Sequence, residues 1–105
     1  MKKINNILII DTSSIKEVQV GLEINGKKYF LSSVVDRKTQ AVLPMVEKLL
    51  KKHKLSVRDI SEIKVNPGPG SFTGLRVGIS IANALGFLLN IPVNGKKAII
   101  EPVYS

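Results

Sequence analysis

Residues 66–76 read Asn-Pro-Gly-Pro-Gly-Ser-Phe-Thr-Gly-Leu-Arg, two Pro-Gly pairs that lead directly into a long apolar segment. Proline fixes φ and glycine admits positive φ, so the pairs at Gly68 and Gly70 predict a tight, stiff turn. Ser71 and Thr73 are candidates to cap a helix that starts here. Such a corner can bind an anion at the helix start, or it can simply start the helix at a fixed angle. The spacing of Gly and Pro alone favours the second interpretation.

The residues before this corner predict three strands and one helix. Residues 7–10 form a continuous apolar run, typical of a strand buried on both faces, and residues 17–24 alternate strictly, as a half-buried strand does. Asn-Gly at 25–26 is a strong hairpin signal, so residues 27–35 are expected to form the return strand. Helical spacing over residues 39–53 predicts a helix with one apolar face. That face comprises Val42, Leu43, Val46, Leu49 and Leu50.

The residues around and beyond the corner complete an α/β domain. Residues 62–66 predict a short strand, residues 73–89 a second helix, and residues 91–93 and 98–100 two further extended segments. The chain has 105 residues, with no repeat and no low-complexity linker. The order of elements therefore predicts a single α/β domain, in which a mixed sheet is covered by two helices that pack together.

The second predicted helix carries a small residue at every fourth position, which places these residues along one stripe. Glycine inside a soluble helix costs about 0.5–1 kcal/mol relative to alanine, so such a run indicates close packing against the helix backbone. The neighbour is either the rest of the same domain, which the spacing alone somewhat favours, or a partner protein. The stripe consists of Gly74, Gly78, Ala82 and Gly86.

Composition narrows the class of protein. The formal net charge is +8, from 16 Lys and Arg against 8 Asp and Glu, which fits either a polyanionic partner such as RNA or a solvated, lysine-rich surface. The chain has no cysteine, and its N-terminus lacks the pattern of a signal peptide. The apolar run in residues 77–89 is interrupted by Ser80 and Asn83. We therefore expect a cytoplasmic protein that does not associate with a membrane.

Few residues offer catalytic chemistry. His53 is the only histidine and lies among lysines, and no cluster of His, Cys and carboxylates has the spacing of a metal site. Asp11 closes a buried strand and could suit a nucleotide or a metal, although a local turn residue is the favoured interpretation. Arg76 falls in a first helical turn, where its charge opposes the helix dipole, so a partner's carboxylate or phosphate is a candidate contact. We expect no catalytic residue and no metal site.

Three motifs occur here in an order that is specific to one family. They are residues 66–82, the Ile-Leu-Ile-Ile-Asp-Thr-Ser run at 7–13, and Thr-Gln at 39–40 followed by Leu-Pro-Met-Val at 43–46. These segments resemble, in turn, the signature segment, the first strand and turn, and the first helix of the Gcp-like family, in its TsaB (YeaZ) branch. The resemblance spans roughly residues 7–95 and implies one lobe of an actin-like ATPase (ASKHA, RNase H-like) fold.

The resemblance also implies a function. TsaB proteins are non-catalytic subunits that bind TsaD, the threonylcarbamoyl transferase, and act with TsaE to modify the adenosine beside the anticodon of tRNA. The tRNA would then be bound only through the complex. In the family, the two helices form the interface with TsaD, and a similar face joins two copies into a homodimer. The interface residues expected here are Gln40, Leu43, Val46, Leu50, Gly74, Arg76, Gly78 and Ala82.

Two other functions remain open. The chain could be a small nucleotide-binding ATPase lobe, although an actin-like ATPase closes its site between two lobes. ATP or ADP is therefore expected only at the interface of a complex, with no cofactor bound by this chain alone. The charge by itself would also fit a module that binds tRNA directly. The nucleotide or anion loop would consist of Asp11, Thr12, Ser13, Gly68, Gly70, Ser71 and Thr73.

Two departures from the family pattern matter. Lys38 stands where the family usually has a histidine before Thr-Gln, so this chain lacks any contact that the histidine makes. The sequence ends at Ser105 without the family's second lobe. Residues 96–105 resemble the family's C-terminal segment. The resemblance therefore implies either a natural minimal form, a single N-terminal-type domain over residues 1–105, or a truncated chain.

Overall fold

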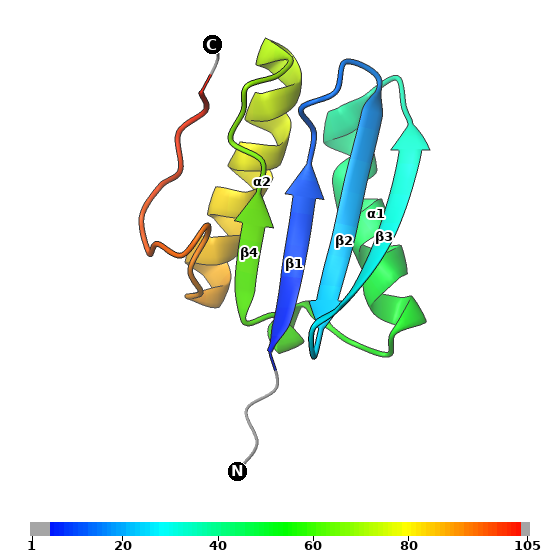
Figure 1. Ribbon diagram of the computed structural model, residues 1–105, viewed down its shortest axis with the longest axis vertical. Coiled ribbons are helices and arrows are strands. Elements are labelled where there is room, and N and C mark those ends of the chain that lie inside the picture. The colour runs from blue at the N-terminus through cyan, green and yellow to red at the C-terminus, as the bar shows by residue number, and fades with distance from the viewer. Residues whose placement is uncertain (1–4, 104–105) are drawn as a thin grey trace.

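The computed structural model describes residues 5–103, which fold into four strands, two α-helices and one 3-10 turn (Figure 1). The strands are β1 (Asn6–Asp11), β2 (Glu17–Ile24), β3 (Lys27–Val34) and β4 (Glu62–Val65). The helices are α1 (Lys38–Lys52) and α2 (Phe72–Leu89), and the 3-10 turn η1 spans Val57–Asp59. The βββαβα order confirms the order predicted from the sequence.

The strands form one mixed sheet in the order β3-β2-β1-β4 (Figure 1). β2 pairs antiparallel with both β1 and β3, whereas β1 and β4 run parallel. The β2–β3 hairpin turns at Asn25 and Gly26, which both have positive φ, 51° and 84°. Asparagine and glycine tolerate this conformation, which matches the twist of the two strands, so the dipeptide fixes the register of the hairpin.

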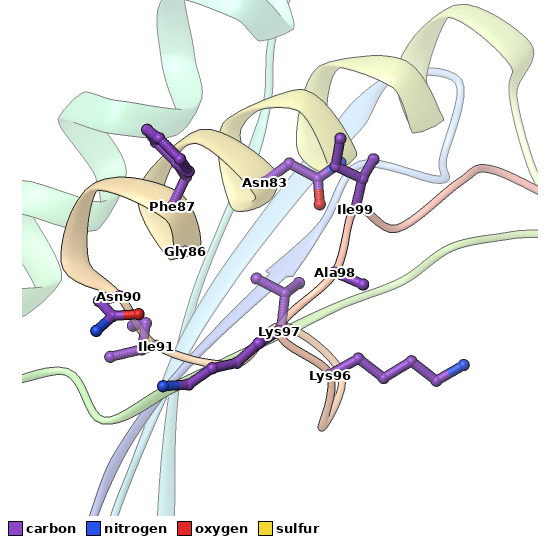
Figure 2. A pocket seen from close by; sticks show the side chains of 10 residues that line it. Asn83, Gly86, Phe87, Asn90, Ile91, Lys96, Lys97, Ala98 and Ile99 are labelled. Atoms are coloured by element: carbon purple, nitrogen blue, oxygen red, sulfur yellow. The ribbon is translucent and has the colours of Figure 1, made fainter.

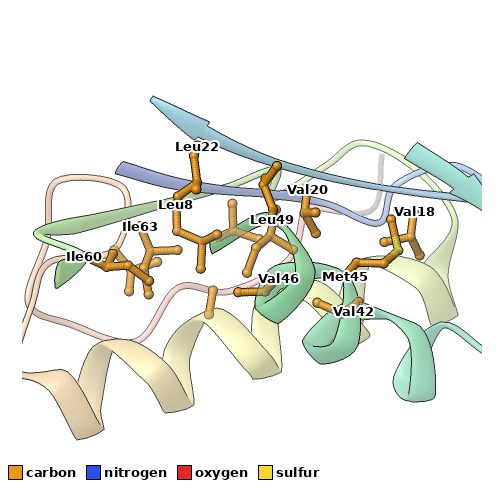
Figure 3. Packing of buried hydrophobic residues seen from close by; sticks show 14 of the residues in the cluster. Leu8, Val18, Val20, Leu22, Val42, Met45, Val46, Leu49, Ile60 and Ile63 are labelled. Atoms are coloured by element: carbon orange, nitrogen blue, oxygen red, sulfur yellow. The ribbon is translucent and has the colours of Figure 1, made fainter. Parts of the chain in front are cut away.

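Both helices cover the same face of the sheet, and the core lies between them and the strands (Figure 3). Alternate residues of β1, such as Leu8 and Ile10, point to this face and are fully buried. Helix α1 fills the space with large side chains at helical spacing. The buried residues of α1 are Val42, Met45, Val46, Leu49 and Leu50.

The apolar face of α1 differs from the prediction at one position. Leu43 was expected in the core but is 49% exposed, and Met45 is buried in its place. With 3.6 residues per turn, Met45 shares a face with Val42, three residues before it, and with Leu49, four residues after it. Leu43 is rotated by about 100° from Val42, away from Met45. Leu43 is therefore a surface residue of α1.

Helix α2 is long and apolar enough, at 18 residues and a mean hydropathy of 1.5, to meet a membrane-span criterion of length and composition. A core helix of a soluble protein meets the same criterion. Here one side of α2 packs on the sheet, where Leu75, Ile79 and Ala82 are buried. Ser71 caps its first turn by accepting a hydrogen bond from the Gly74 amide at 3.4 Å, as the sequence predicted.

Residues 91–93 do not form a strand as predicted, and only an isolated parallel bridge joins them to β4. Val93 bridges to Ile63 in the parallel sense, but Asn94 has a φ of 51° and turns the chain away from the sheet. The Asn94 side chain then replaces the missing backbone: its Oδ1 accepts from Val65 N at 2.8 Å and its Nδ2 donates to Val65 O at 3.0 Å. The sheet therefore ends at β4 with a side chain in place of a fifth strand.

The last described residues return along α2 towards the Pro-Gly corner (Figure 1). Asn83 holds this segment with two hydrogen bonds, donating to Ile100 O at 2.9 Å and accepting from Ile100 N at 3.0 Å. Further on, Val103 N donates to Pro67 O at 2.6 Å. Of the predicted resemblance to a C-terminal segment, residues 104 and 105 lie outside the described part of the chain.

Candidate functional site

The turn after β1 and the Pro-Gly corner before α2 meet at one end of the sheet. The Asp11 carboxylate accepts hydrogen bonds from the amide and the hydroxyl of Ser13, at 2.9 and 2.6 Å, and from Asn66 Nδ2 at 3.3 Å. Asn66 Nδ2 also donates to Ser13 Oγ at 3.1 Å, while Asn66 Oδ1 accepts from Gly68 N at 3.0 Å. Asp11, Ser13 and Asn66 therefore form one network that joins the two segments.

The Pro-Gly corner fits against the β1–β2 turn because two of its positions, Gly68 and Gly70, are glycines without side chains. Ser71 N donates to Ser13 O at 2.9 Å. A Cβ atom added at Gly70 would lie 2.7 Å from Ser13 Cβ, closer than real Cβ contacts allow. Gly68 has a φ of 120°, which side chains rarely permit, and it packs against the backbone of Val103. The two glycines thus allow the backbone of three segments to converge.

Thr12 joins β1 to α2. Its side chain is 1% exposed, and its hydroxyl donates to Gly74 O at 2.5 Å and accepts from Gly78 N at 3.0 Å. A Cβ atom at Gly78 would lie 2.5 Å from Thr12 Oγ1. Thr12 therefore occupies space that any side chain at Gly78 would take.

Lys38 reaches into the same corner from the first residue of α1. Its ammonium group donates to Thr12 O at 3.0 Å and to Ser14 O. Burial lowers the pKa of Lys38 from its ordinary 10.5, while the nearby charge of Asp11 acts in the opposite direction. Lys38, which stands where the family usually has a histidine, thus links α1 to the β1–β2 turn by hydrogen bonds.

Hydrogen bonds keep Asp11 ionised. Burial alone would raise the pKa of Asp11, but the donors of Ser13 and Asn66, together with the charge of Lys38, lower it below its ordinary 3.8. A carboxylate that accepts several hydrogen bonds is acceptor-only and holds its donors in place. Its geometry is that of a local turn residue, the interpretation that the sequence favoured.

The predicted nucleotide or anion loop is brought together, and several backbone amides in and beside it already have partners within the chain. The amides of Ser13, Gly68, Ser71 and Gly74 donate to Asp11, Asn66, Ser13 and Ser71 in turn. Beside them, a cavity of about 280 Å³ opens between the starts of α1 and α2. Its lining includes Lys38, Ser71 and Thr73. The corner thus has space for a small ligand but uses these amides to hold itself together.

The stripe of small residues on α2 faces the sheet, not a partner. Gly74, Gly78, Ala82 and Gly86 are all buried. A Cβ atom at Gly86 would lie 2.5 Å from Val93 Cγ2, just as one at Gly78 would meet Thr12. The expectation that Gly74, Gly78 and Ala82 contact a partner protein is therefore wrong in this structure. Packing inside the domain, the alternative that spacing favoured, is what is observed.

The remaining expected interface residues divide by exposure. Gln40, Leu43 and Arg76 are exposed on α1 and α2, and the Arg76 guanidinium lies 5.0 Å from the centre of the Phe72 ring. Val46 and Leu50 are only 2% exposed and belong to the core, so their assignment to an interface is also wrong. The helix surface that remains exposed for a partner carries both polar and apolar residues, and it includes Ser80 and Ala84.

The sequence-based reasoning missed the asparagines. Asn66 links Asp11 to the Pro-Gly corner, Asn83 holds residue 100, and Asn94 closes the sheet. A signal for two of them was present, since Asn66 and Asn94 each follow an apolar run at a point where the chain must turn.

Within residues 5–103, no group of three or more His, Cys, Asp or Glu side chains is placed to hold a metal ion.

The comparisons with known proteins agree on one family. Residues 33–98 match the family of TsaD, described as tRNA N6-adenosine threonylcarbamoyltransferase. The tRNA threonylcarbamoyladenosine biosynthesis protein TsaB of Buchnera aphidicola subsp. Schizaphis graminum is 38% identical over 90 residues, which cover 85% of this chain and 42% of the relative. The TsaB protein of Escherichia coli is 36% identical over 95 residues, which cover 90% of this chain and 41% of the relative.

A solved structure extends the likeness to the fold. YeaZ from Pseudomonas aeruginosa superposes with a TM-score of 0.79 at 33% identity, over 85% of this chain and 42% of that one. The chain thus spans about two fifths of the length of the curated relatives it matches. Its sheet with α1 and α2 on one face is a single lobe of the actin-like (ASKHA, RNase H-like) fold. The chain belongs to the Gcp-like family of tRNA threonylcarbamoyladenosine biosynthesis proteins, to which TsaB (YeaZ) and TsaD belong.

Proposed function

We propose that this chain is a non-catalytic, cytoplasmic subunit in tRNA threonylcarbamoyladenosine biosynthesis, and that it binds a TsaD-type transferase through the outer surface of α1 and α2. The observation that carries the proposal is this pair of helices on one sheet face, in a chain whose similar proteins are named for that pathway. Leu43 on α1 and Ala84 on α2 are exposed on the outer side of the helices. They replace the buried small stripe as the expected contacts.

The way the polar residues are used supports the proposed non-catalytic role. The polar side chains at this corner make hydrogen bonds within the chain that hold the fold together. They belong to Asp11, Thr12, Ser13 and Lys38. His53 lies at the end of α1 and packs on the Tyr29 ring, with 4.3 Å between ring centres. A nucleophile needs a base within hydrogen-bond reach, and within the described residues His53 Nε2 has no hydrogen-bond partner. The transfer step therefore belongs to the TsaD partner, with TsaE as a further component and tRNA bound by the assembly.

The test is binding to the TsaD of the same organism, measured by isothermal titration with purified proteins. Leu43→Asp and Ala84→Asp each place a carboxylate on the outer helix surface without disturbing the core. We expect each to weaken binding at least about tenfold, as removal of an interface anchor does. Val57→Asp is the matched control, because Val57 is 41% exposed but lies outside both helices.

Modification of tRNA in a reconstituted system provides the second readout. Supplied with tRNA and a threonylcarbamoyl donor, TsaD and TsaE with this chain should form threonylcarbamoyladenosine, and the chain alone should form none. Leu43→Asp should reduce the yield in parallel with binding. Unchanged TsaD affinity in both helix variants would refute the proposed surface. Product formed by the chain alone would refute the non-catalytic role.

A nucleotide-binding lobe is the alternative, and one observation favours it. The cavity beside Lys38, Ser71 and Thr73 lies between two helix starts, where anions are attracted. Titration of ATP and ADP into the free chain, and into its complex with TsaD, tests the alternative directly. We expect no binding to the free chain. ATP hydrolysis by the free chain that is lost in a folded Asp11→Ala variant would favour the ATPase lobe instead.

A further inference from the structure

A groove lies at the other end of the molecule, between the second half of α2 and the segment that follows it (Figure 2). Figure 2 shows α2 along one side and residues 96–99 along the other. The groove has a volume of about 260 Å³. Its lining comprises Asn83, Gly86, Phe87, Asn90, Ile91, Val93, Lys96, Lys97, Ala98 and Ile99. Leu43 and Ala84, the two contacts proposed for TsaD, do not line it.

Both walls of the groove are fixed by hydrogen bonds. Ile99 precedes Ile100, whose amide and carbonyl are both held by Asn83 of α2. Lys96 is held by two backbone bonds to Val93, at 2.9 and 3.1 Å. The floor exists because Gly86 has no side chain and lets Val93 approach α2. The groove is thus formed before anything binds, which reduces the entropy cost of binding.

The groove exposes more apolar surface than single surface residues usually do. Phe87 is 85% exposed and Ile99 is 80% exposed, and they line the same groove. Two exposed apolar side chains that line one concave site are available to contact a partner. A volume of about 260 Å³ is smaller than most cofactor pockets and accommodates a few side chains of a partner.

The charge of the groove indicates which partner fits. Two lysines and no acidic residue line it. The ion pairs in residues 5–103 join Lys28 to Glu23 and Lys51 to Glu47, so neither Lys96 nor Lys97 has an acidic partner there. A second copy of a chain with net charge +8 would bring like charge to the groove. A lipid surface is flat, whereas this site is concave.

We propose that this groove binds an acidic amphipathic helix of a partner protein. Apolar side chains of that helix, spaced three and four residues apart, enter between Phe87 and Ile99, and its carboxylates lie over Lys96 and Lys97. The proposal is tested apart from the TsaD contact, because neither Leu43 nor Ala84 lines this groove. Electrostatic attraction speeds the encounter, and the apolar contacts hold the helix.

The probe is a fluorescent peptide whose leucines recur at helical spacing and whose other positions are glutamate, with a lysine version for comparison. Binding to the full chain is followed by fluorescence anisotropy at two salt concentrations. We expect the glutamate peptide to bind and the lysine peptide to bind at least about tenfold more weakly. Affinity for the glutamate peptide should fall as salt rises.

Matched variants locate the site. Ile99→Ser should weaken binding about tenfold, while Leu88→Ser, at a residue 75% exposed on α2 but outside the groove, should leave it unchanged. Lys97→Glu should weaken binding, while the same charge change at exposed Lys52 of α1 should not. Circular dichroism verifies that each variant is folded.

Three results would overturn the proposal. They are equal binding of both peptides, equal effects of Lys97→Glu and Lys52→Glu, and dimerisation of the free chain that Ile99→Ser abolishes. Binding to vesicles of phosphatidylcholine and phosphatidylglycerol that also depends on Ile99 would assign the groove to a membrane instead. Loss of TsaD binding in Leu43→Asp leaves the peptide measurement unaffected, so the two proposals fail separately.

Discussion

Helices α1 and α2 lie on the same face of the sheet but are held to it by opposite means. Helix α1 inserts large side chains, from Val42 to Leu50, into the space above β1 and β2 (Figure 3). Helix α2 approaches by leaving side chains out: its glycines let Thr12 and Val93 touch the helix backbone. A helix packed by large side chains, such as α1, tolerates some loss of side-chain volume. A helix packed by close backbone approach, such as α2, tolerates no larger side chain at the contact.

The difference explains why the apolar pattern predicted most of the buried side of α1 but did not identify the buried side of α2. A large apolar residue at helical spacing identifies the buried side directly, as Val42 and Leu49 do. On α2 nearly every side is apolar, so the buried side is marked by residue size instead. The stripe from Gly74 to Gly86 is the side nearest the sheet.

A leucine at Gly78 should break the close approach and give the largest effect. The first added carbon would lie 2.5 Å from Thr12 Oγ1 and 3.3 Å from Ile10 Cγ2, so β1 and α2 must separate. We expect Gly78→Leu to lower the free energy of unfolding by at least ~3 kcal/mol, measured by urea denaturation followed by circular dichroism. Ala84→Leu, on the exposed side of the same helix, should change it little. Equal stability of the two variants would contradict the packing described for α2.

Removal of a large side chain from α1 should give the next largest effect. Leu49 is 4% exposed, and Leu49→Ala leaves a cavity that costs about 2–4 kcal/mol. Leu43→Ala makes the same change at a residue that is 49% exposed and should cost less than about 1 kcal/mol. Similar losses at both positions would mean that α1 is rotated relative to the orientation described here.

The hydroxyl of Thr12 tests the tie between β1 and α2 without changing volume. Thr12→Val keeps the shape but leaves Gly74 O and Gly78 N without their bridging partner. We expect a loss of about 1–2 kcal/mol in the free energy of unfolding. Thr39→Val, at an exposed position of α1, is the control and should be close to neutral. A neutral result at Thr12 would show that the hydroxyl adds nothing to the packing.

Acid should reveal the smallest effect, at Asp11. Its pKa is lowered below 3.8 in the folded protein, so the folded state favours the ionised form. The resulting stability is present above the ordinary pKa and is lost as pH falls through the folded value. Asp11→Asn should therefore flatten the decline of unfolding free energy below pH 3.8, measured by urea denaturation at several pH values. A decline as steep in Asp11→Asn as in the unchanged protein would remove Asp11 from the acid response.

Local patterns sufficed to predict the elements but not their mutual contacts. Asn25-Gly26 and the alternation of residues 17–24 fixed the hairpin because both signals act within a few residues. Asp11 accepts two hydrogen bonds from nearby Ser13 and a third from Asn66, which lies 55 residues away in the chain. Sequence motifs placed both residues at strand ends, but only the parallel pairing of β1 and β4 makes them neighbours.

The candidate site shows the same division. The sequence assigned Asp11 and the Pro-Gly corner to one predicted loop, yet it did not show that Lys38 would donate to the carbonyls of Thr12 and Ser14. Exposure on the helices also depended on rotation, since Leu43 is 49% exposed and Val46, three positions further along α1, is 2% exposed. An error of one position in helical phase therefore exchanges a surface residue for a core residue.

The Asn94 side chain limits how copies of this chain can join through their sheets. The outward backbone groups of Ile63 and Val65 on β4 are all bonded, to Pro92 and Asn94. Within residues 5–103, only the outer edge of β3 is left for strand pairing. Two copies joined there would present a closed β4 edge on each side, so no third copy could add. Edge-to-edge aggregation of the folded protein would thus terminate at a pair, and fibril growth would require β4 to release Asn94 first.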